Sequence, residues 1–69
     1  MQNLKKVVVG KESKEKLESL FCWVYRNEIV NDIGHIQSGE IVKIQDQNAK
    51  FLALGYINPL SEITLRVLS

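Results

Sequence analysis

Residues 40–57 read EIVKIQDQNAKFLALGYI, two apolar runs joined by a short polar link. Asp46 and Asn48 in the link favour a reverse turn, so the stretch predicts a β-hairpin with strands over residues 40–45 and 50–57. The second strand is apolar at successive positions, which is typical of a strand covered on both faces. We therefore expect this hairpin to form the centre of a closed or covered sheet.

Three further strands are predicted on either side of the hairpin. Lys5–Val9 is a β-branched run that stops at Gly10, and Trp23–Tyr25 combines aromatic and β-branched residues. Pro59 ends the second hairpin strand, because proline lacks a backbone donor. Ile63–Leu68 then alternates in a way that predicts a last strand. About five strands are expected in all.

Residues 13–21 follow a helical period. Ser13 is the expected N-cap, and an apolar stripe recurs at Leu17, Leu20 and Phe21. A helix this short is not stable alone and must pack on the sheet. The fold class is therefore mainly β with one short helix (α+β), a small mixed sheet rolled into a pseudo-barrel.

The size and charge of the chain limit what it can be. Its 69 residues leave room for one core, so residues 1–69 are expected to form a single domain. Nine basic and eight acidic residues give a net charge of +1, yet residues 1–16 hold five lysines against two glutamates. That excess fits a phosphate-facing side or, more simply, a solvated lysine-rich surface.

Cysteine usage and hydropathy indicate the compartment. The single cysteine, Cys22, cannot form an internal disulfide, which suits a reducing cytosol. The run Val7–Val9 is too short for a signal peptide, and no run approaches the roughly 20 apolar residues of a membrane span. We expect a cytoplasmic protein without a membrane partner.

Catalytic chemistry finds little support in the sequence. One histidine and one cysteine cannot supply the usual zinc ligand sets, and no glycine-rich phosphate loop occurs. His35 would need an orienting carboxylate to act as a base, and Asp32 is the only acid near it in sequence. A loop histidine without a role is the simpler interpretation. We therefore expect no catalytic, metal or cofactor site in this chain.

With catalysis unsupported, the remaining candidate function of these residues is binding. Aromatic side chains can stack on unpaired bases while basic side chains contact phosphates. The candidate RNA-binding residues are Lys11, Lys14, Tyr25 and Arg26. Trp23 and Tyr56 could also stack on bases, but their position in strands favours core packing. Arg66 could pair with Glu62 or Glu40, or contact RNA.

Three stretches resemble a known family. Trp23–Ile29 (WVYRNEI) and Gly39–Val42 (GEIV) are similar to segments of PUA-containing 23S rRNA cytosine-C5 methyltransferases. The most specific match is Phe51–Leu68 (FLALGYINPLSEITLRVL), which resembles that family's F-L-x-x-G-x-x-N-P-x-S-x-I-x-x-R-V-L signature. One departure is that Leu20–Cys22 stand where the family usually has Gly-His-Pro, a loop that could help approach RNA.

This resemblance implies a role. In that family the module is an N-terminal PUA domain, followed by a linking domain and a catalytic domain that uses S-adenosylmethionine. The chain is then expected to be the N-terminal part of a longer methyltransferase, an accessory domain that binds rRNA and is not itself an enzyme. The alternative is a structural domain that packs on its own catalytic domain or, as a homodimer, on a second copy; the near-neutral charge favours this reading.

Overall fold

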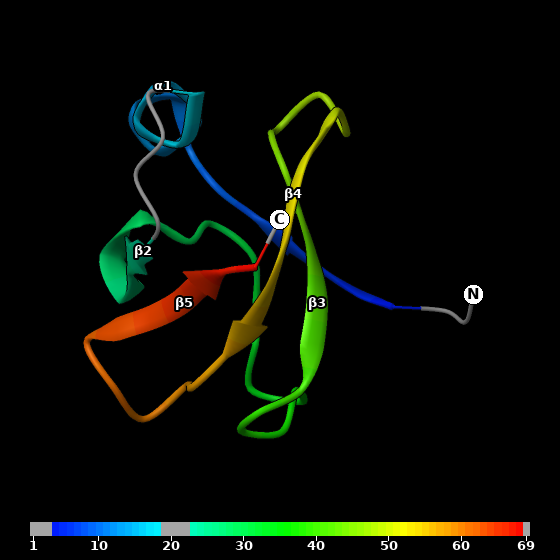
Figure 1. The fold of residues 1–69 in the computed structure, drawn as a ribbon, viewed down its shortest axis with the longest axis vertical. Coiled ribbons are helices and arrows are strands. Elements are labelled where there is room, and N and C mark those ends of the chain that lie inside the picture. The colour runs from blue at the N-terminus through cyan, green and yellow to red at the C-terminus, as the bar shows by residue number, and fades with distance from the viewer. Residues whose placement is uncertain (1–3, 19–22, 69) are drawn as a thin grey trace.

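A computed structural model describes residues 4–18 and 23–68 of the chain. Its elements are, in chain order, β1 (Lys5–Val8), α1 (Lys11–Glu18), β2 (Trp23–Tyr25), the 3-10 helix η1 (Arg26–Glu28), β3 (Ile41–Gln45), β4 (Phe51–Ile57) and β5 (Ile63–Val67). The strands form one sheet in the order β1-β3-β4-β5-β2 (Figure 1). β1 runs parallel to β3 and the other pairs are antiparallel. The predicted fold class, a mainly β mixed sheet with one short α-helix in the described residues, is confirmed.

The predicted hairpin is β3 and β4, and β4 lies between β3 and β5. One side chain organises its turn. The Asp46 carboxylate accepts hydrogen bonds from the backbone N–H groups of Asn48 and Lys50, each at 2.9 Å. Ala49 takes the left-handed conformation, with φ 67°. Because local sequence sets both the turn and the pattern, this element was predictable.

The sheet closes on itself through the edge of β1. Val9 forms an isolated antiparallel bridge with Ile29, and the Val30 N–H donates to the Val8 carbonyl at 2.9 Å. The Asn31 side chain adds two bonds to β1 across this seam, accepting from the Val8 N–H at 2.9 Å and donating to the Lys6 carbonyl at 3.1 Å. Backbone groups that an open edge would expose are thereby satisfied, as in a pseudo-barrel.

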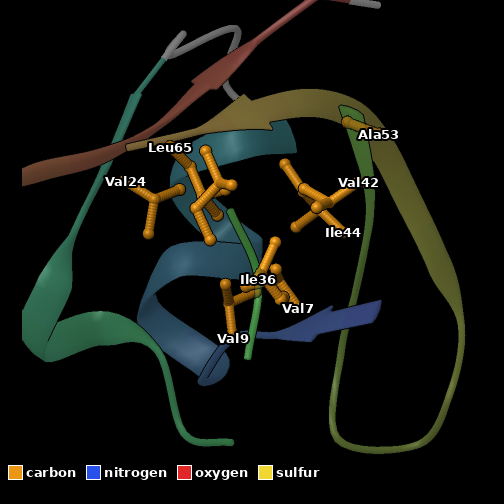
Figure 2. Close-up of a cluster of buried hydrophobic side chains, with 9 residues drawn as sticks. Val7, Val9, Val24, Ile36, Val42, Ile44, Ala53 and Leu65 are labelled. Atoms are coloured by element: carbon orange, nitrogen blue, oxygen red, sulfur yellow. The ribbon is translucent and has the colours of Figure 1, made fainter. Parts of the chain in front are cut away.

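The core occupies the interior of this curled sheet. Nine buried apolar side chains form it: Val7, Val9, Val24, Ile36, Val42, Ile44, Ala53, Ile57 and Leu65 (Figure 2). Leu17 of α1 is half-buried and packs against the cluster. The helix therefore covers part of the core, as its shortness requires.

The start of α1 differs from the prediction. The helix begins at Lys11, and the Gly10 carbonyl accepts the Lys14 N–H at 3.0 Å. Ser13, the predicted N-cap, lies inside the first turn and is buried, so that prediction was wrong. Glycine is also accepted at a helix N-cap, so Gly10 can take that place and the helix starts earlier. The predicted stripe residues Leu20 and Phe21, and the departure at Leu20–Cys22, lie outside the described residues.

The link from β4 to β5 is a turn at Asn58–Pro59, as predicted. The Ser61 N–H donates to the Asn58 carbonyl at 3.1 Å, and the Ser61 hydroxyl accepts the Ile63 N–H at 3.2 Å. The buried Thr64 hydroxyl donates to the Ser61 carbonyl at 2.8 Å. Within the described residues, no helix has the length and hydropathy needed to cross a membrane.

Candidate nucleic-acid interface

Two of the predicted site residues lie at the corner where β2 passes into η1. A register shift between Val24 and Tyr25 bends the chain there, and the Arg26 N–H donates to the Glu62 carbonyl at 2.9 Å. The Tyr25 ring and the Arg26 guanidinium are both exposed. With Asn27 and Glu62 they line an open cleft of about 390 Å³. A bulge of this kind re-aims side chains at a sheet edge.

A second groove joins this cleft to the start of α1. Gly10, Lys11, Glu12 and Ser13 line it on the helix side, and Tyr25, Asn27, Glu28 and Val30 line it on the other side. Tyr25 and Asn27 line both hollows. We call the joined region the corner surface and define it by Lys11, Tyr25, Arg26 and Asn27. Three of the four predicted residues therefore lie together, although Lys11 and Arg26 are 15 positions apart in the chain.

The fourth, Lys14, is directed elsewhere. Its ammonium group is 3.4 Å from the Asp46 carboxylate, whose side chain is only 7% exposed. The N–H of Lys50, then that of Asn48 and the Lys14 ammonium, hold the pKa of Asp46 below its ordinary value of 3.8 in spite of desolvation. Lys14 thus ties α1 to the β3–β4 turn, and its predicted role in RNA binding remains a prediction.

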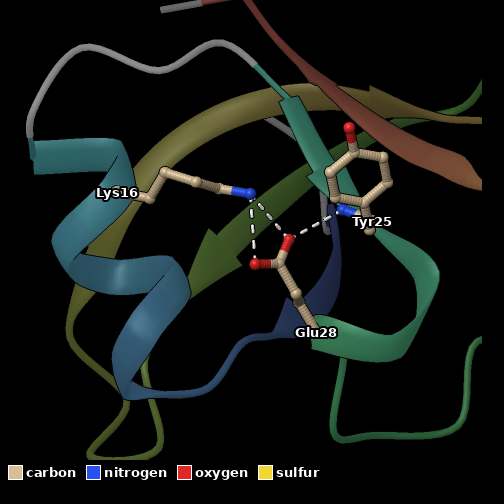
Figure 3. A network of polar contacts seen from close by, with 3 residues as sticks. All are labelled: Lys16, Tyr25 and Glu28. Atoms are coloured by element: carbon tan, nitrogen blue, oxygen red, sulfur yellow. Dashed lines mark hydrogen bonds and ion pairs between the residues drawn. The ribbon is translucent and has the colours of Figure 1, made fainter.

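A polar network positions Tyr25 (Figure 3). The Lys16 ammonium donates to both Glu28 carboxylate oxygens, at 2.8 and 3.1 Å, and lies 5.1 Å from the centre of the Tyr25 ring. Glu28 also accepts the Tyr25 N–H at 2.8 Å. A cation–π contact holds the ring, and Tyr25 remains exposed to solvent. No local sequence pattern indicates this network, because its ion pair joins residues 12 positions apart in the chain.

The network predicts a pH effect. Desolvation raises the pKa of Glu28, but the bonds from Lys16 and Tyr25 outweigh it and leave the pKa below its ordinary value of 4.5. A lowered folded-state pKa stabilises the fold above the unfolded value, and this contribution is lost as the pH falls through the folded value. Glu28→Gln should therefore lower the free energy of unfolding by about 1–3 kcal/mol at pH 7, and the difference should shrink below pH 4.5.

Urea unfolding at neutral and acid pH measures this effect, with Glu15→Gln, an exposed position of α1 next to Lys16, as the control. An equal loss at all pH values would show that the carboxylate charge has no part in it.

The other aromatic and basic candidates have different environments. Tyr56 was expected in the core but is 37% exposed, because the alternate β4 positions Ala53, Gly55 and Ile57 face inward. Trp23 is half-buried. Arg66 is exposed, and no salt bridge of the described residues joins it to Glu62 or Glu40; Glu40 instead lies 3.4 Å from Lys5. His35 is exposed in the loop before β3.

No three His, Cys, Asp or Glu side chains come together as a metal site in the part of the chain that the structure describes.

A mixed five-stranded sheet that curls around an apolar core, is partly covered by α1 and carries an aromatic and basic corner defines a small β-barrel binding module. A model of the PUA-like domain family matches residues 7–69, so the chain belongs to that family. PUA-like domains generally bind RNA and are not catalytic by themselves. Among curated proteins, none matches the chain at a significant level.

Proposed function

We propose that this chain is the RNA-binding accessory domain of an S-adenosylmethionine-dependent rRNA (cytosine-5) methyltransferase. It positions RNA for a catalytic domain that follows it in the same protein. The observation that carries the RNA-binding part is the meeting of Lys11, Tyr25 and Arg26 on one surface of a domain whose family generally binds RNA.

The chemistry of the corner surface suits a few directed contacts. Arg26 has five N–H donors, of which one donates weakly to the Ser61 carbonyl at 3.4 Å, so most remain available to a phosphate. The Tyr25 ring is held in place before any ligand arrives, which lowers the entropy cost of stacking or packing on a nucleotide. Glu12 and Glu62 also line the hollows, so the corner is not a broad cationic patch.

The methyltransferase part depends on the resemblance of Phe51–Leu68. In the fold this stretch is β4, the Asn58–Pro59 turn and β5. Its turn supports the corner, since the Glu62 and Ser61 carbonyls accept the backbone and side-chain N–H groups of Arg26. The signature residues therefore stabilise the fold in a way that a PUA-like domain of any enzyme could require. The methyltransferase activity of the longer protein remains part of the proposal.

S-adenosylmethionine would be bound outside this domain. The residues of this chain do not fit a nucleotide-type cofactor site, which needs a glycine-rich turn at a strand end. The strand–glycine–helix unit at Gly10 has one glycine, and Glu12 and Glu28 line the groove beside it. The cofactor is accordingly assigned to the catalytic domain, and the whole protein is assigned to the cytoplasm.

Charge reversal at the corner tests the RNA-binding part. The double variant Lys11→Glu/Arg26→Glu should bind an RNA hairpin about 10-fold or more weakly at low salt, with a salt slope reduced by about 2, because two phosphate contacts are lost. Fluorescence anisotropy of a labelled hairpin over a salt series measures both. Lys50→Glu, at an exposed position of the β3–β4 turn, is the control for a single charge reversal away from the corner. Lys14 is left unchanged, since a glutamate there would face Asp46.

Two results would decide against the proposal. Equal affinity of the double variant and the control would show that the corner surface does not bind RNA. Salt-insensitive binding, or none by the wild-type chain and the longer protein, would instead favour the alternative role of packing on a catalytic domain or a second copy.

A further inference from the structure

Four strands contribute one row of side chains to the outer face of the sheet. Tyr56 of β4 pairs with Ile41 of β3 and with Arg66 of β5, and Arg66 pairs with Trp23 of β2. Directly opposed residues project to the same side of a sheet. Their sequence neighbours Val42, Gly55, Leu65 and Val24 are all buried, so the row itself faces away from the core.

A second row lies next to the first on the same face. Lys6 of β1 pairs with Lys43 of β3, which pairs with Leu54 of β4. Their neighbours Val7, Ile44 and Ala53 belong to the core. We call the two rows the outer face; its members are Ile41, Tyr56, Arg66, Trp23, Lys6, Lys43 and Leu54.

The charge of the outer face has one sign. Its rows hold three of the nine basic residues, Lys6, Lys43 and Arg66, and none of the eight acidic ones. The salt bridges recorded for residues 4–18 and 23–68 use Lys5, Lys14 and Lys16 instead. On a chain with a net charge of only +1, this is a local concentration of cations without anionic partners in the described fold.

We propose that the outer face binds a single-stranded RNA segment, and this inference deepens the proposed function. A base stacks on the exposed Tyr56 ring, Arg66 lies beside it, and Lys43 and Lys6 contact phosphates. Interleaved aromatic and cationic side chains are what unpaired RNA requires. A protein partner would have to bury three cations, which is costly unless it supplies matching carboxylates. The two surfaces would then bind two parts of one RNA. The corner surface would bind a structured element, and the outer face would bind the single strand that flanks it.

The test compares a blunt RNA hairpin with the same hairpin carrying a tail of about six unpaired uridines. In the wild-type chain the tail should increase affinity. Tyr56→Thr should reduce affinity for the tailed RNA by roughly 5- to 100-fold, for the loss of one stacked base. Arg66→Gln should also reduce it, and both variants should leave binding of the blunt hairpin unaffected. Threonine keeps the β propensity of position 56. Phe51→Thr and Lys50→Gln, exposed positions outside both rows, are the matched controls.

Photo-crosslinking of the wild-type chain to a 4-thiouridine tail provides a readout that needs no variant. Crosslinks should map to Tyr56 or its neighbours in the rows. Mapping to the corner surface alone would overturn the inference, even if a variant failed to fold.

The outcomes separate the two proposals. If the outer-face variants keep the full gain from the tail, the inference is overturned, while loss of blunt-hairpin binding in Lys11→Glu/Arg26→Glu still supports the proposed function. If the corner variant binds the blunt hairpin like the wild type, the proposed function fails. If Tyr56→Thr abolishes self-association in sedimentation without changing affinity for the tailed RNA, the outer face is a protein interface and the inference is overturned.

Discussion

Leu65→Ala is expected to lower the free energy of unfolding by about 2–5 kcal/mol, the range for emptying a fully buried leucine site. Leu65 is 0% exposed, and its register partners Val24 and Ile57 are core residues as well. The cavity would open between β2, β4 and β5, where strands on all sides limit collapse. A chain of 69 residues has little stability to lose, so a large fraction should be unfolded at 37 °C.

Leu60→Ala is the matched control for this cavity. Leu60 lies in the turn between β4 and β5 and is 89% exposed, so the same truncation should change stability by no more than about 0.5 kcal/mol. Urea unfolding followed by circular dichroism measures both variants. Equal losses would mean that β5 is not packed on the core as described.

Gly55→Ser should destabilise the fold by about 1–3 kcal/mol, through crowding instead of a cavity. A Cβ atom at this position of β4 would lie 2.7 Å from the Arg66 carbonyl oxygen and 3.0 Å from Cδ1 of Ile44. The first contact is with backbone, so β4 and β5 must separate to relieve it. This explains why the Phe51–Leu68 signature needs glycine here. Because β5 carries Arg66 and leads back to the corner, RNA binding should weaken with it.

Gly10→Ser controls for the loss of a glycine. A Cβ at Gly10 would have nothing within 4 Å, and serine is a favourable residue before a helix. We expect thermal melting to show no loss of stability, or a slight gain. If Gly55→Ser had the same melting temperature as the wild type, the close approach of β4 and β5 would be contradicted.

The parts of the fold that sequence predicted were those encoded locally. The β3–β4 hairpin has its strand pattern and turn residues within 18 positions, and the Asn58–Pro59 break is equally local. Tyr56 was misplaced because a strand apolar at nearly every position does not indicate which face is inward. Register alone decides that, and here the core takes Ala53, Gly55 and Ile57.

The candidate site was predictable as a set of residue types but not as a surface. Lys11 and Arg26 come together only because the Val9–Ile29 bridge closes the sheet beside α1. The ion pairs of Lys14 with Asp46 and of Lys16 with Glu28 join residues that no local pattern connects. Lys14 is thereby directed to the β3–β4 turn and Lys16 to Tyr25. Composition alone does not distinguish these two lysines.

Closure of the sheet also connects stability to function. The Gly10 N–H donates to the Glu28 carbonyl at 3.2 Å, so the seam runs through the two segments that carry the corner surface. Variants that loosen the core, such as Leu65→Ala, should therefore weaken RNA binding without touching a contact residue. For this reason each binding variant needs a melting curve beside its affinity.

An NMR titration tests whether the corner surface binds RNA. The ¹⁵N-labelled chain is titrated with the RNA hairpin at about 50 mM and about 200 mM salt. We predict that the amide signals of Lys11, Tyr25, Arg26 and Asn27 shift at low salt and that the shifts decrease at the higher salt. Unchanged signals at these four residues, with shifts elsewhere or none, would show that RNA does not bind at the corner surface.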